Sequence, residues 1–157
     1  MAMTEGTVSF HAVSTTRTAA WFGEQLGMRS TRSAEIGELV GNGRYGRRHE
    51  FAIWTLERDF DNDSAEPLND ALLALLSEFD GREDVLDGLR EDHDLRVQCH
   101  GSSASSQGGF WPAPQALQRL GRLGVDFTCT VYLADCPDAC RPCRSAVAGP
   151  AGGPIRF

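Results

Sequence analysis

The chain contains no lysine, and all 15 of its basic residues are arginine. The 22 acidic residues outnumber them, and the net charge of −7 argues against general affinity for nucleic acid or an anionic membrane. The first ten residues lack the basic and apolar regions of a secretory signal. No apolar run approaches the length of a membrane span. We therefore expect a cytoplasmic protein without a nucleic-acid or membrane partner.

Length and cysteine usage suggest a single intracellular domain. With 157 residues, of which 41% are hydrophobic and 24% charged, the chain resembles ordinary soluble globular proteins. Five cysteines, an odd number, in a chain without an export signal indicate reduced thiols rather than a disulfide framework. We expect one α+β domain over residues 1–134 and a flexible tail rich in cysteine, proline and glycine over residues 135–157.

Residues 108–132 contain the clearest structural signals. Pro112 and Pro114 suit the first turn of a helix, where a backbone N–H is not needed. Apolar residues then recur three and four positions apart as far as Gly124, which can end a helix in the left-handed conformation. From residue 125 onward apolar and polar residues alternate. This stretch predicts a helix followed by a half-buried strand.

The remaining periodicity completes an α+β pattern. Alternation predicts strands over residues 7–13, 50–56 and 95–100. Apolar stripes predict a helix that ends at Gly27, one that begins at Pro67 and one over residues 83–90. Residues 28–49 predict a long loop with one helical turn over residues 35–40. Together these predict a four-stranded, mostly antiparallel sheet with helices on one face, in a split βαβ (ferredoxin-like) arrangement with extra central helices.

The order of these pieces resembles the bacterial family known as domain of unknown function 4279. The similarity extends over residues 8–132 and includes Leu26-Gly27-Met28, the strand FAIWTL, the helix from Pro67 and the ending GGFWPAPQALQRLGRLGVDFTCTVY. That family has no established activity, cofactor or catalytic residue, so the resemblance implies no function. The arginine–glycine loop and the cysteine-bearing tail depart from the family pattern.

The outer face of the predicted sheet is the main candidate binding surface. Polar residues around a tryptophan resemble a recognition platform, because aromatic anchors contribute much interface energy. An ordinary polar sheet face, with the tryptophan packed beneath the long loop, is the alternative. His11 and His100 have no Ser, Cys or Asp partner in a recognised catalytic arrangement, so no residue is assigned a catalytic role. The candidates are His11, Trp54, Arg96, Gln98, His100, Thr128 and Thr130.

The tail offers a candidate metal site. Cys136, Cys140 and Cys143 have the C-x₃-C-x₂-C spacing with which thiolates ligate zinc. A structural zinc site needs a fourth ligand, which this cluster does not itself supply. We therefore expect no cofactor, with zinc as the alternative.

Charge is distributed unevenly along the chain. Residues 57–94 contain 14 acidic residues and three arginines, a net charge of −11, whereas residues 29–49 have a net charge of +3. Such polarity can steer a charged partner, although charged runs also simply solvate helices and loops. We expect a protein-binding module, immunity-like or accessory, without catalysis. The alternatives are a small-molecule-binding or enzymatic domain that uses the polar sheet face, and metal binding through the C-terminal cysteines. The sequence does not indicate an oligomeric state.

Overall fold

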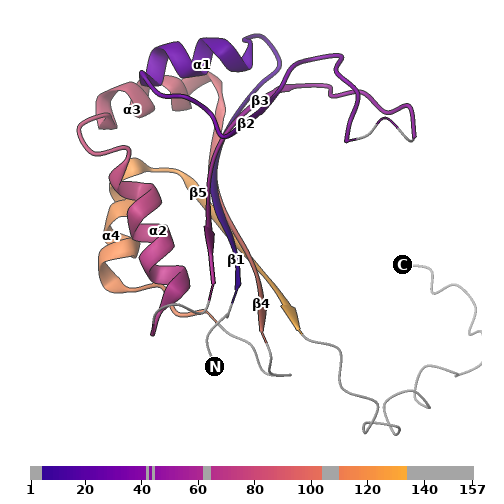
Figure 1. Ribbon diagram of the computed structural model, residues 1–157. Coiled ribbons are helices and arrows are strands. Elements are labelled where there is room, and N and C mark those ends of the chain that lie inside the picture. Colours follow the sequence, from indigo (N-terminus) through magenta and orange to yellow (C-terminus); the bar gives the residue numbers. More distant parts are fainter. Residues whose placement is uncertain (1–4, 42, 44, 62–64, 104–109, 134–157) are drawn as a thin grey trace, which may run out of the picture.

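The computed structural model describes residues 5–41, 43, 45–61, 65–103 and 110–133. In this part of the chain, four helices cover one face of a five-stranded sheet (Figure 1). The α+β class is therefore confirmed. The elements in chain order are β1 (Glu5–Ser14), α1 (Ala19–Leu26), β2 (Arg32–Ala34), β3 (Ala52–Phe60), α2 (Pro67–Ser77), α3 (Glu83–Asp92), β4 (Asp94–Ser103), α4 (Pro114–Leu123) and β5 (Asp126–Leu133).

The strand order is β2-β3-β1-β4-β5. The first four strands pair antiparallel with their neighbours, so β1 and β2 run parallel with β3 between them. Strands β3 and β4 are likewise parallel and separated by β1. Two split βαβ units therefore interlock in these four strands, one through α1 and the other through α2 and α3.

The predicted strand count was wrong. The missed strand is β2, whose three residues are too few to show alternation. The last predicted strand is β5, which adds parallel to β4 after the crossover helix α4. Because β4 and β5 are direct neighbours, the unit β4-α4-β5 is an ordinary βαβ. It therefore differs from the N-terminal unit β1-α1-β2, in which β3 lies between the two strands. The result is a mixed sheet.

The core lies between the sheet and the helices. Phe10 of β1 contacts the ring of Phe79 at 4.4 Å between centroids and the ring of Trp54 at 6.2 Å. Alternate residues of β1 and β4 and most residues of the apolar helix stripes are buried here. Val85 and Leu117 fit the apolar spacing of α3 and α4, yet both are exposed. Removing a large buried apolar side chain from such a core typically costs about 2–5 kcal/mol.

Helix ends match their sequence signals at Gly27, Gly124 and Pro114, whereas the expected place of Pro112 in the first turn of a helix was wrong. Gly27 and Gly124 follow α1 and α4 with φ values of 63° and 58°, the left-handed conformation that glycine adopts without strain. Pro114 occupies the first turn of α4, whereas Pro112 lies before the helix. Arg90 donates to the carbonyl oxygens of Leu123 and Gly124 at 3.0 Å each, which satisfies acceptors at the end of α4.

Residues 35–51 connect β2 and β3, and the described ones among them, all but 42 and 44, form a hairpin that is here called the arm. Backbone hydrogen bonds join its sides. Val40 N–H donates to the Arg47 carbonyl and His49 N–H donates to the Glu38 carbonyl, each at 2.8 Å. Arg48 Nη1 donates to the Gly37 carbonyl at 2.6 Å. The described part of the predicted loop, residues 28–49, is thus irregular apart from β2 and one isolated bridge between Leu39 and Arg48, and in place of a helical turn over residues 35–40 it has a turn in which Glu38 N–H donates to Glu35 O at 3.1 Å. Figure 1 shows the arm projecting from the sheet on the side away from the helices.

No helix within the described ranges is long and apolar enough to cross a membrane. The predicted tail, residues 135–157, lies outside the described residues.

Candidate binding face

The sheet face opposite the helices carries no helix in the described part of the chain, and only the arm overhangs it (Figure 1). Residues paired across neighbouring strands point to the same side of a sheet. His11 pairs with Arg96, Gln98 with Thr128, and His100 with Thr130. The structure therefore brings these six predicted binding residues together on one face. The candidate residues on this face are His11, Arg96, Gln98, His100, Thr128 and Thr130.

Trp54 lies on the opposite face. It pairs with Ala12 of β1, whose side chain is in the core, and it is only 1% exposed. Alternation along β3 accordingly places Ile53 and Thr55 on the open face. The indole packs beneath α1, where an added Cβ on Gly23 would approach Trp54 Nε1 to 3.4 Å. The expected tryptophan at the centre of the polar platform is therefore not there.

His11 is held in a hydrogen-bonded network at the centre of the face. Ser9 Oγ lies 2.8 Å from His11 Nε2 and donates to the Gln98 carbonyl at 3.4 Å. His11 Nδ1 lies 3.0 Å from Thr55 Oγ1, and the donor and acceptor roles of the two ring nitrogens depend on the tautomer. Both ring nitrogens are engaged by hydroxyl groups of the face.

The electrostatic environment keeps the His11 imidazole neutral. Burial, together with the nearby positive charges of Arg96, Arg32 and His100, lowers the pKa of His11 to about 4, against a smaller opposing effect of Asp94. The cations near His11 therefore outweigh the anions. An acceptor or an anionic group would be favoured at this part of the face.

Both arginines near His11 are paired with carboxylates. Arg32 Nη2 lies 2.7 Å from Glu57 Oε1, and Arg96 Nη2 forms an ion pair with Asp94. Arg96 Nε is buried and has no hydrogen-bond partner within the described ranges. Exposed pairs such as these contribute little to stability, about 0–1 kcal/mol each. Their main effect is to fix where the guanidinium groups lie on the face.

A cavity of about 410 Å³ lies between the arm and this face. Its floor includes His11, Ile53 and Thr55 of the sheet, and the arm supplies an apolar wall of Leu39 and Val40. The volume falls within the usual range for small-molecule sites, about 300–1,000 Å³. The remaining lining residues are Arg32, Ser33, Ala34, Glu38, Gly41 and His49.

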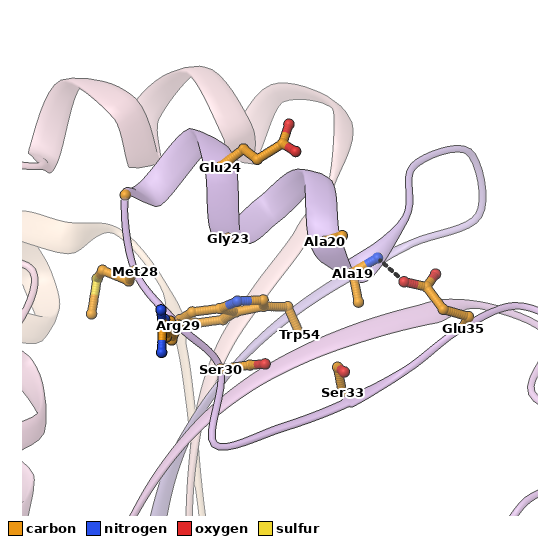
Figure 2. Close-up of a pocket in the computed structure, with 11 residues that line it drawn as sticks. Ala19, Ala20, Gly23, Glu24, Met28, Arg29, Ser30, Ser33, Glu35 and Trp54 are labelled. Carbon is orange, nitrogen blue, oxygen red and sulfur yellow. Dashed lines mark hydrogen bonds between the residues drawn. The ribbon is translucent and has the colours of Figure 1, made fainter.

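A second hollow, of about 610 Å³, lies between α1 and the segment that leads into β2 (Figure 2). Glu35 marks one end of it and accepts a hydrogen bond from Ala19 N–H at 2.9 Å, which ties the base of the arm to the start of α1. Trp54 borders this hollow, yet almost none of its surface is accessible. The hollow therefore offers no aromatic platform to a ligand.

The predicted metal ligands Cys136, Cys140 and Cys143 lie outside the described residues. Within the described ranges, no group of three His, Cys, Asp or Glu side chains is placed to hold a metal ion. Cys99 and Cys129 pair across β4 and β5, and both are free thiols. Burial raises the pKa of Cys99 to about 12, with a smaller effect of Cys129, and burial also raises the pKa of Cys129.

The fold and this face define a small α+β domain with an open polar sheet surface overhung by a hairpin. The family model of a domain of unknown function, DUF4279, matches residues 4–134, and the chain belongs to this family. No curated protein and no solved structure matches the chain.

Sequence reasoning missed part of the site. Thr55 and the cavity wall of Leu39 and Val40 were not predicted. Alternation in FAIWTL does separate Thr55 from Trp54, but only the pairing of β3 with β1 shows which of the two lies inside. Apolar residues do not recur at a regular spacing in the arm, so the sequence did not indicate that Leu39 and Val40 line a cavity.

Proposed function

We propose that this chain is a protein-binding module, of the immunity or accessory type, that docks its partner on the arm and the adjoining open sheet face. The observation that supports this best is the concentration of exposed apolar residues on the arm. Nine large apolar side chains are exposed in the described part of the chain, and five of them belong to the arm: Ile36, Leu39, Val40, Tyr45 and Phe51. Such clusters on otherwise polar surfaces mark interaction sites.

Charge defines the kind of partner. The tip of the arm, residues 41–49, contains three arginines and no acidic residue. Tyr45 within it is 83% exposed, and tyrosine and arginine are the residue types that most often anchor interfaces. Five carboxylates of the acidic run lie instead on α3, on the helix-covered side of the sheet. The partner surface suited to the tip is therefore acidic with an apolar recess.

The proposal is tested with one arm variant and one matched control. The partner would be isolated from native lysate at low salt, purified and titrated against the purified chain. Tyr45→Ser with Arg47→Glu removes an aromatic and reverses a charge on the arm. We expect about a tenfold or larger loss of affinity, and the wild-type affinity should fall as salt is raised. The matched control is Leu117→Ser with Arg122→Glu. It makes the same kinds of change on the exposed side of α4, away from the arm.

Equal losses for the two double variants would rule out the arm as the docking site. If no purified protein binds the wild-type chain directly, the binding-module proposal itself fails.

A further inference from the structure

We infer that the cavity between the arm and the sheet binds a small organic carboxylate, with its apolar body against the arm and its charged group at Arg32. This cavity lies within the surface of the docking proposal but does not include the residues that the docking test changes. Tyr45 and Arg47 do not line the cavity, whereas Leu39 and Val40 do. The two proposals can therefore be tested separately.

The apolar part of the ligand is indicated by the cavity wall. Leu39 and Val40 are each more than two-fifths exposed, although both line a concave site. Ile53 and Ala34 face them from the sheet and are only partly buried. A ligand body that covered these four side chains would remove their apolar surface from water, which is favourable.

The charged part is indicated by Arg32. Arg32 is the only arginine that lines the cavity in the described part of the chain, and its side chain is 69% exposed. Glu57 engages Nη2, and within the described ranges the other guanidinium N–H groups remain as donors to a second carboxylate. Planar guanidinium groups bind carboxylates with two parallel hydrogen bonds.

The one carboxylate in the lining does not cancel this preference. Glu38 Oε2 accepts from the backbone N–H of Glu35 at 2.8 Å, which holds this carboxylate against its own segment of the arm. On the floor, the neutral His11 lies close to Arg96, Arg32 and His100, so positive charge prevails there. A single guanidinium suits a singly charged carboxylate, since phosphate sites usually gather several donors.

The test uses two probes of the same shape, phenylacetate and its neutral analogue phenylacetamide. Each is titrated into the full chain while the backbone amide resonances are followed by NMR. We expect phenylacetate to shift the amides of residues 38–41 and of Ile53 and Thr55 saturably. Phenylacetamide should bind about tenfold more weakly, because it lacks the charge-assisted hydrogen bonds.

Two variants locate the site. Arg32→Gln should reduce phenylacetate affinity to that of phenylacetamide and leave the amide's affinity unchanged. Ala34→Leu should fill the cavity and weaken both probes. Should Ala34→Leu fail to fold, Leu39→Asn serves instead, because Leu39 is already half exposed. Arg122→Gln on α4 is the matched control and should bind both probes like the wild type.

Three results would overturn the inference: no saturable shift for either probe, equal affinity for both, or equal weakening by Arg32→Gln and Arg122→Gln. None of them bears on the docking test, which changes Tyr45 and Arg47.

Discussion

Leu39 and Arg48 face each other across an isolated antiparallel bridge midway along the arm. This bridge turns a segment without sequence periodicity into a hairpin whose shape exists before any partner arrives. Gly43 folds closely over Leu39, since an added Cβ there would lie 3.1 Å from Leu39 Cδ1. A preformed binding element loses less conformational entropy when it binds than a disordered one.

The first prediction concerns the order of the arm. Amide hydrogens of Gly37, Val40 and His49 donate to arm carbonyls, so their exchange with solvent should be slowed relative to an unstructured chain. NMR-detected exchange on the free protein measures this. Exchange of all three amides at the unstructured rate would mean that the hairpin is not formed in solution.

The second prediction concerns the link between α2 and the start of α4. Asn69 is buried, and its side chain accepts from Ala113 N–H at 2.8 Å and donates to the Trp111 carbonyl at 3.1 Å. Asn69→Ala should lower the free energy of unfolding by about 1–3 kcal/mol, because it leaves partly buried backbone groups without their partner. Urea denaturation measures the change. Gln118→Ala, on the exposed side of α4, is the control and should cost less than about 0.5 kcal/mol.

The third prediction concerns pH. The pKa of His11 is about 4 in the folded chain and 6.5 as its ordinary value. Between these values the unfolded chain binds more protons than the folded one, so stability falls as pH falls from 6.5 to about 4. His11→Gln, which cannot titrate, should lose less stability over this window. We expect a difference of about 1–2 kcal/mol, less than the pKa difference alone implies because the imidazole is partly exposed to solvent.

Denaturation of both proteins at pH 7 and pH 4.5 gives this difference directly. A wild type and a His11→Gln variant with the same pH dependence would show that His11 titrates normally in the folded state.

The fourth prediction concerns the two described thiols. Burial raises the pKa of both Cys99 and Cys129, and Cys99 is completely buried. In a chain with Cys136, Cys140 and Cys143 replaced by serine, a thiol reagent at pH 8 should modify Cys129 slowly and Cys99 only after unfolding, because the thiolate is the reactive form. Mass spectrometry of the labelled peptides reads the order. Modification of Cys99 before Cys129 in the native protein would contradict the placement of β4.

The sequence predicted the fold where a period of two or 3.6 runs over a full element. Val8 and Phe10 of β1 and Phe22 of α1 are buried as their spacing predicted. Prediction from periodicity failed for β2, because three residues are too few to show an alternation and the strand pairs only with β3. Leu117 fits the apolar spacing of α4 yet is 53% exposed, because a local period does not say which residues of a stripe the rest of the fold covers.

The candidate binding face was predictable only in part, because local patterns do not show how distant segments pack together. Local alternation places His11, Arg96 and Thr128 on a polar face, and the structure brings them together. Trp54 was misplaced because both faces of its strand carry apolar residues, and only the register with Ala12 decides which face is buried. The cavity depends on the fold of the arm over the sheet, which is a long-range arrangement that no local pattern encodes.

The most direct test of the central claim is hydrogen exchange of the chain with and without its purified partner, followed by mass spectrometry. If the arm docks the partner, peptides that cover residues 36–51 should gain protection in the complex, together with peptides of the open sheet face. Peptides of α2 and α3 should be unchanged. Protection confined to α2 and α3, with no change in the arm, would contradict the account.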